Sequence, residues 1–202
     1  MNSNTLTTKK KKLTLESEAV KGELITFENE SFYKISNSDK MRPFFMSIVS
    51  DSNHWMFISS NGGLTAGRKN AESSLFPYYT DDKITEMAET TGSKAIFQVN
   101  LNGNTRIWEP FSIRQMGMYQ TETNLYKNVF GNKVVFEEKN LDLGLTFRYQ
   151  WNSSNQFGFV KKSTLINDSD VTLEVTILDG LQNILPSNVT SDLQNSRSNL
   201  VD

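Results

Sequence analysis

A regular alternation of apolar and polar residues runs through positions 141–151. Every second position is apolar, and the positions between hold aspartate, glycine, threonine, arginine and glutamine. A period of two is typical of a β-strand with one buried face. The same period returns at 171–177, and two clusters of turn residues, 152–155 and 167–170, enclose a third run at 156–166. These runs predict an antiparallel meander.

Tight turns recur upstream of this meander. Asn102-Gly103 ends an alternating run at 95–101, and this pair is typical of a type I′ hairpin turn. Gly131-Asn132 and the polar cluster 50–53 predict two further hairpins. About nine or ten short strands with polar turns predict a mainly β chain folded as an antiparallel two-sheet β-sandwich. Helix should be scarce, with Thr80 and Ser191 as candidate caps of two short helices.

The segment 59–84, SSNGGLTAGRKNAESSLFPYYTDDKI, breaks the alternation. It has no clean period and is dense in glycine, asparagine and serine, so it predicts a loop in place of a regular strand. Its glycines allow positive φ angles or a close approach of two backbones. Long loops in compact domains are commonly functional, so this segment is the first place to look for a site.

Five residues of this segment are candidate carbohydrate-binding or interface residues: Arg68, Tyr78, Tyr79, Asp81 and Asp82. Arginine offers a planar fork of donors, tyrosine rings suit the C–H faces of sugars, and carboxylates accept from hydroxyls. An alternative is that the two aspartates and Thr80 cap the following helix. Carboxylates adjacent in sequence do not flank a glycosidic bond from opposite sides, so no catalytic residue is predicted.

Composition narrows the classes of partner. Net charge is −2, with 21 basic and 23 acidic residues, so the chain lacks the overall positive potential that attracts nucleic acid or anionic membranes. The absence of cysteine and the single histidine, His54, leave no ligand set for a transition metal. Neither a secretory signal nor a membrane span is evident, so we expect a cytoplasmic protein with a flexible tail over residues 1–15.

Two stretches carry a family resemblance: SNGGLTAGRKNAESSLFPYYTDDKI at 60–84 and LEVTILDGLQNILP at 173–186. With the sandwich pattern between them, the chain resembles the N-terminal domain of bacterial cellobiose-phosphorylase-like proteins, similar to glycoside hydrolase family 94. The resemblance covers most of residues 20–190. It implies a galactose-mutarotase-like supersandwich over 16–186, with 187–202 as the truncated start of a helical linker to an (α/α)6 barrel.

The resemblance also implies a function. In that family the barrel carries the catalytic aspartate and the phosphate site, and the N-terminal domain contributes to dimer contacts and to the wall of the sugar site. This chain would then be the non-catalytic, carbohydrate-associated domain of a glycoside phosphorylase that cleaves a β-linked disaccharide, with inorganic phosphate as co-substrate and no cofactor. Its partners would be carbohydrate, its own C-terminal catalytic domain and a second copy. Two alternatives stay open: a free-standing carbohydrate-binding module, and a structural or dimerisation domain that binds no sugar.

Overall fold

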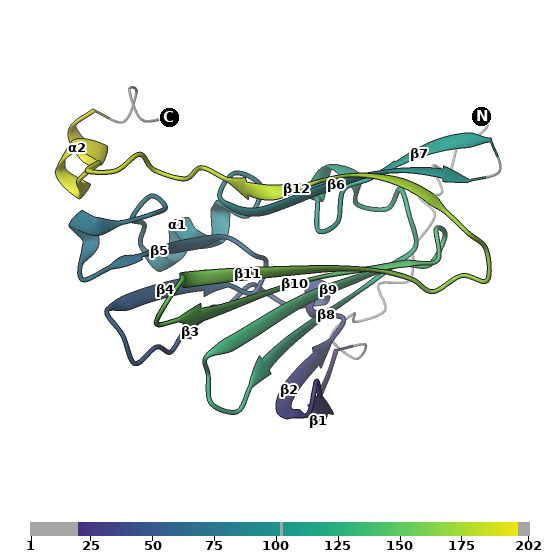
Figure 1. The fold of residues 1–202 in the computed structure, drawn as a ribbon, viewed down its shortest axis with the longest axis horizontal. Coiled ribbons are helices and arrows are strands. Elements are labelled where there is room, and N and C mark those ends of the chain that lie inside the picture. The colour runs from purple at the N-terminus through teal and green to yellow at the C-terminus, as the bar shows by residue number, and fades with distance from the viewer. Residues whose placement is uncertain (1–19, 102, 198–202) are drawn as a thin grey trace, which may run out of the picture.

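The computed structural model of the protein describes residues 20–101 and 103–197 (Figure 1). Within these residues the chain is mainly β, with twelve strands and two short α-helices. Every strand pairing is antiparallel. The mainly β, antiparallel prediction is therefore confirmed. The predicted tail, 1–15, and the last five residues of the predicted linker lie outside the described part of the chain.

The largest sheet has six strands in the order β1-β2-β8-β9-β10-β11. Its last four strands form a meander, in which each strand pairs with the next along the chain. The meander predicted over 141–177 is therefore only partly correct: the runs at 141–151 and 156–166 pair with each other, but the run at 171–177 leads into a strand that pairs with β6 in another sheet. The strands are β1 (Lys21–Phe27), β2 (Glu30–Ser36), β8 (Thr121–Asn128), β9 (Lys133–Asn140), β10 (Leu145–Ser154) and β11 (Gly158–Asn167).

Two three-stranded sheets accompany it, in the orders β12-β6-β7 and β3-β4-β5. In Figure 1, β12 and β6 run across one face of the six-stranded sheet, and β3, β4 and β5 lie toward one end of the molecule. The remaining elements are β3 (Phe45–Ile48), β4 (His54–Ser59), β5 (Leu64–Arg68), β6 (Gly92–Leu101), β7 (Asn104–Trp108), β12 (Glu174–Gln182), α1 (Asp81–Glu86) and α2 (Ser191–Ser196).

The inward face of β10 supplies much of the core. Leu145, Phe147, Tyr149 and Trp151 are all buried, as the alternation predicted. The ring of Phe147 lies edge-on to Phe97 of β6, with 5.1 Å between ring centroids. This contact joins the six-stranded sheet to the β12-β6-β7 sheet, and buried residues of all three sheets form one hydrophobic cluster.

Two of the predicted strands have different limits. Leu141 is 53% exposed in the turn between β9 and β10, because Gly144, at φ 62°, completes that turn and β10 starts only at Leu145. β12 starts later and ends later than predicted, and its Ile177 is exposed. β12 pairs with β6 alone, so its alternating residues are covered on fewer sides than those of a central strand.

The prediction of a loop across 59–84 is wrong for part of that segment. Residues Leu64–Arg68 form β5, which pairs with β4. The strand is buried on both faces, so it shows no alternation. Its glycines permit close packing: a Cβ on Gly67 would lie 2.7 Å from the Ser73 carbonyl oxygen, and one on Gly63 would lie 2.0 Å from that of Ile84.

Both helices occur where they were predicted, but their caps differ in detail. Thr80 precedes α1, yet its hydroxyl donates to Asp82 Oδ1 at 2.5 Å and makes no cap bond to the helix backbone. Thr190, one residue before the predicted cap Ser191, precedes α2, and its hydroxyl oxygen accepts from the backbone N–H of Leu193 at 3.2 Å.

Candidate functional site

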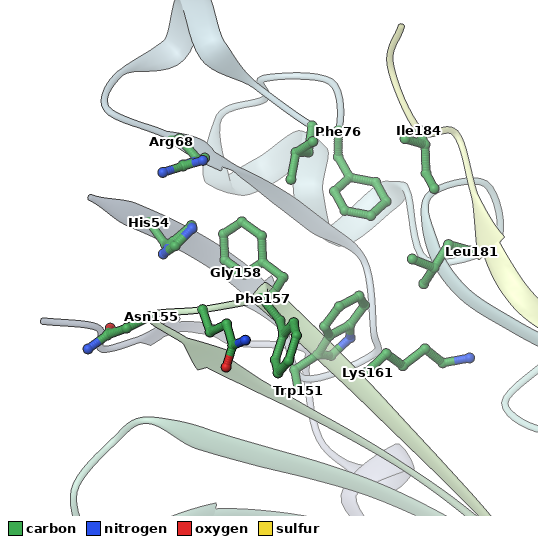
Figure 2. A pocket seen from close by; sticks show the side chains of 13 residues that line it. His54, Arg68, Phe76, Trp151, Asn155, Phe157, Gly158, Lys161, Leu181 and Ile184 are labelled. Atoms are coloured by element: carbon green, nitrogen blue, oxygen red, sulfur yellow. The ribbon is translucent and has the colours of Figure 1, made fainter. Parts of the chain in front are cut away.

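A cleft of about 450 Å³ opens where three parts of the fold meet (Figure 2). The parts are the β4-β5 hairpin with the segment after it, the β10-β11 hairpin, and the end of β12. We call it the hairpin cleft. Its lining consists of His54, Arg68, Leu75, Phe76, Trp151, Asn155, Gln156, Phe157, Gly158, Phe159, Lys161, Leu181 and Ile184.

Aromatic rings form much of the wall. Trp151 is the last buried inward residue of β10, only 1% exposed, and Phe76 meets it edge-on at 6.5 Å. Phe157, in the β10-β11 turn, is 73% exposed. Phe159 packs edge-on against the His54 imidazole at 5.1 Å. Phe157 therefore presents the most exposed ring face of this wall, and such a face suits flat, weakly polar surfaces such as the C–H face of a sugar ring.

The polar lining groups come from separate elements. Asn155 and Gln156 bring amides from the β10-β11 turn. Lys161 of β11 is paired, because its Nζ donates to Asp179 Oδ1 at 2.5 Å and to the Gly180 carbonyl at 3.1 Å. Arg68, at the end of β5, bonds only weakly, with Nε and Nη2 each 3.4 Å from Asn53 Oδ1. Among the described residues, no aspartate or glutamate lines the cleft.

His54 and Arg68 face each other across the β4-β5 hairpin as register partners. The imidazole Nδ1 lies 2.6 Å from the Ser52 hydroxyl. On its other side, Nε2 lies against Gly158, where an added Cβ would be 3.2 Å away. Glycine at this turn position, with φ 74°, therefore lets the β10-β11 hairpin approach the histidine closely.

The indole N–H of Trp151 has no hydrogen-bond partner within the described part of the chain. Figure 2 shows this side chain in the cleft wall between Phe157 and Lys161. Buried polar groups in folded proteins are nearly always paired, so an unpaired donor in the wall of a cleft indicates that a ligand supplies the acceptor.

Of the five predicted site residues, the structure places Arg68 in the hairpin cleft. Tyr78 and Tyr79 follow the cleft residue Phe76 in sequence but are not part of the lining. Tyr78 is 47% exposed, packs edge-on against Trp55 at 5.7 Å, and donates its backbone N–H to Gln194 Oε1 at 3.1 Å. Tyr79 is half-buried. The structure therefore does not gather the predicted residues into one site.

Both aspartates belong to the start of α1, and Asp82 lies outside the cleft lining. The Thr80 hydroxyl and then the Lys83 backbone N–H hold the pKa of Asp82 below its usual value. The prediction that Thr80 caps this helix is wrong, because its side chain bonds to Asp82 and not to the helix backbone. Asp81 begins the helix, and its side chain lies outside the described part of the structure.

Sequence reasoning missed the aromatic and amide residues of the cleft. The alternation predicts position 151 only as an inward strand residue, and the turn signals predict residue 155 only as part of a turn cluster. One signal was available. A phenylalanine next to two amides in a hairpin turn, Asn155-Gln156-Phe157, is unusual, because turns favour small and polar residues.

A second polar cluster lies on the six-stranded sheet and involves Glu137, Asn124, Tyr126 and Arg148; we call it the Glu137 network. Glu137 Oε1 accepts from Asn124 Nδ2 at 2.7 Å and from the Tyr126 hydroxyl at 2.8 Å, while Arg148 Nε donates to Oε2. Burial raises the pKa of Glu137, but the bonds from Arg148 and Tyr126 outweigh it and leave this pKa below its usual value.

The neighbouring carboxylate, Glu138, points to the other face of β9. It accepts from Trp108 Nε1 at 2.9 Å and from the Phe111 backbone N–H at 2.6 Å. No cation of the described residues pairs with it, so burial raises its pKa despite these two bonds. The two adjacent glutamates therefore have pKa values shifted in opposite directions.

Neither a scan against protein-family models nor a search of curated proteins found a match for this chain. Residues 20–101 and 103–197 contain no group of three histidine, cysteine or acidic side chains placed to hold a metal ion. Over the same residues, no helix is long and apolar enough to cross a bilayer. The hairpin cleft is therefore the feature of the described chain that bears on its function.

Proposed function

We propose that this chain is a non-catalytic carbohydrate-binding domain and that the hairpin cleft holds the sugar. The observation that carries the proposal is one cleft that combines the exposed ring of Phe157 and the half-buried ring of Phe159 with the amides of Asn155 and Gln156. Sugar rings have apolar C–H faces and a rim of hydroxyls. Aromatic rings suit the faces, and amides both donate to and accept from the hydroxyls.

The lining favours binding over bond cleavage. Glycoside-cleaving sites need a positioned carboxylic acid, and no carboxylate of residues 20–101 and 103–197 is placed in the lining of the hairpin cleft. We therefore assign the chemistry to another domain. The resemblance noted above supplies a candidate: a cytoplasmic glycoside phosphorylase that cleaves a β-linked disaccharide with inorganic phosphate in a C-terminal barrel, to which this domain would bring or hold the sugar.

Isothermal titration of the chain with cellobiose and cellotetraose tests the proposal. Phe157→Ala should weaken binding by about tenfold, because one aromatic face is removed from the wall. Phe130→Ala is a matched control. Phe130 is also 73% exposed and lies in a hairpin turn, between β8 and β9, but it does not line the cleft. It should bind as the wild type does.

The proposal fails if Phe157→Ala and Phe130→Ala bind with the same affinity. It also fails if none of a panel of neutral and acidic saccharides binds the wild type. The latter result would favour the remaining alternative, a structural domain that binds no sugar.

A further inference from the structure

We infer that the saccharide of the hairpin cleft is anionic, bearing a carboxylate or a phosphate group that pairs with Arg68. This inference rests on the proposed function and adds the chemical class of the ligand. Its two supports are the charge of the lining and its balance of donors and acceptors.

The first support is charge. Arg68 and Lys161 are the charged residues of the lining, and Asp179 neutralises Lys161. Within the described residues, no carboxylate lies within ion-pair distance of the Arg68 guanidinium, whose contacts are the two weak bonds to Asn53. A planar guanidinium fork matches the oxygens of a carboxylate or phosphate in two parallel bonds. The cleft therefore offers one positive charge without a counter-ion.

The second support is the balance of donors and acceptors. Arg68 can only donate, and the unpaired indole N–H of Trp151 can only donate. The acceptors of the lining side chains are the two amide oxygens and the imidazole nitrogen of His54 in its neutral form. A neutral sugar hydroxyl donates as well as accepts, whereas an ionised acid group only accepts. An excess of donors over the whole cleft therefore favours a ligand rich in acceptors, and at the β4-β5 end the donor Arg68 favours an acid group.

The arrangement also gives the ligand a direction. Figure 2 shows Arg68 and His54 at one end of the cleft, with Trp151 and Lys161 at the other. A sugar ring on the aromatic wall would thus have its acid group toward the β4-β5 end. The ligand would contact the β4-β5 and β10-β11 hairpins at the same time, although these hairpins are far apart in the sequence.

Titration calorimetry with four probes tests the inference: cellobiose, cellobiouronic acid, cellobiose 6-phosphate and inorganic phosphate. The acidic disaccharides should bind more tightly than cellobiose, and added salt should weaken only their binding. Arg68→Gln should weaken their binding by about tenfold or more and change that of cellobiose by less than about twofold. Arg106→Gln, an exposed arginine on β7 outside the lining, is the charge control and should change neither.

Tighter binding of the uronate or of the phosphorylated sugar identifies which acid group the cleft binds, and either result supports the inference. Three results overturn it: equal affinity for cellobiose and the acidic sugars, equal effects of Arg68→Gln and Arg106→Gln, or binding of inorganic phosphate as tight as that of the acidic sugars. If cellobiose binding is still sensitive to Phe157→Ala, the proposed function stands without the anionic inference. If no saccharide binds, both fall.

Discussion

The Glu137 network and the hairpin cleft are both polar regions reached by β10, through Arg148 and Trp151, but they differ in how their polar groups are satisfied. In the network, both oxygens of Glu137 are occupied by donors from the two neighbouring strands, β8 and β10. In the cleft, the Arg68 charge has no acidic partner, and the Trp151 N–H has no acceptor among the described residues.

This difference separates a structural role from a binding role. A fully paired buried network stabilises one arrangement of its strands and has no capacity left for a ligand. Unpaired donors in the wall of an open cleft can form hydrogen bonds with the acceptors of a ligand. A polar cluster therefore indicates a binding site by the groups that it leaves unpaired, more than by how many polar residues it contains.

Removing the centre of the network should give the largest effect. Glu137→Ala should lower the free energy of unfolding by about 3 kcal/mol, because Arg148, Tyr126 and Asn124 lose their shared acceptor. Urea denaturation measures the change, and Glu122→Ala, an exposed glutamate on β8, is the control. Saccharide affinity should be unchanged. A loss of affinity with no loss of stability would reverse the two roles.

The two adjacent glutamates should give opposite pH dependences. Because the pKa of Glu137 is lowered on folding, its stabilising contribution is present above the unfolded-state pKa and is lost as pH falls through the folded-state pKa. Because the pKa of Glu138 is raised, its contribution is present below the unfolded-state pKa and is lost as pH rises through the folded-state pKa.

Urea denaturation of two glutamine variants from about pH 3 to 7 separates these contributions. The destabilisation caused by Glu137→Gln should shrink as pH falls. Relative to the wild type, Glu138→Gln should gain stability as pH rises, because its side chain cannot ionise. Slopes of the same sign for both variants would mean that the two faces of β9 do not differ as described.

The smallest effect on stability should come from the cleft. The Arg68→Gln/Phe157→Ala double variant should unfold within about 0.5 kcal/mol of the wild type, since both side chains are exposed and neither belongs to the core. The same denaturation experiment checks this. A loss comparable to that of Glu137→Ala would show that the cleft residues hold the fold together.

How far the sequence predicts the fold depends on how each strand is covered. Phe147 and Tyr149 were predicted to be buried because β10 alternates along most of its length. β5 was missed because its first four residues are all buried, so apolar and polar residues do not alternate along it and only Arg68 at its end is exposed. Ile177 alternates like a core residue but lies on an edge strand, which only the sheet order reveals.

The site was less predictable than the fold. Arg68 was predicted as a candidate from its residue type and its glycine-rich surroundings, and it lines the cleft. Trp151 and Phe157, which line the cleft with Arg68, belong to the β10-β11 hairpin. This hairpin is far from β5 in the sequence and lies near it only because the sheets pack together, so the sequence alone does not predict the cleft. Tyr78 and Asp82 were grouped with Arg68 because they are close in sequence, but they are not in the lining.

Chemical-shift mapping tests the central claim most directly. The chain labelled with ¹⁵N would be titrated with cellobiouronic acid and with cellobiose. We predict that the perturbed backbone amides fall at residues 154–159, 68 and 75–76, and that the Trp151 indole N–H signal moves while that of Trp108, already bonded to Glu138, does not. Perturbations confined to residues 78–82 or to the six-stranded sheet around Glu137, or no perturbation by either saccharide, would contradict a saccharide site in the hairpin cleft.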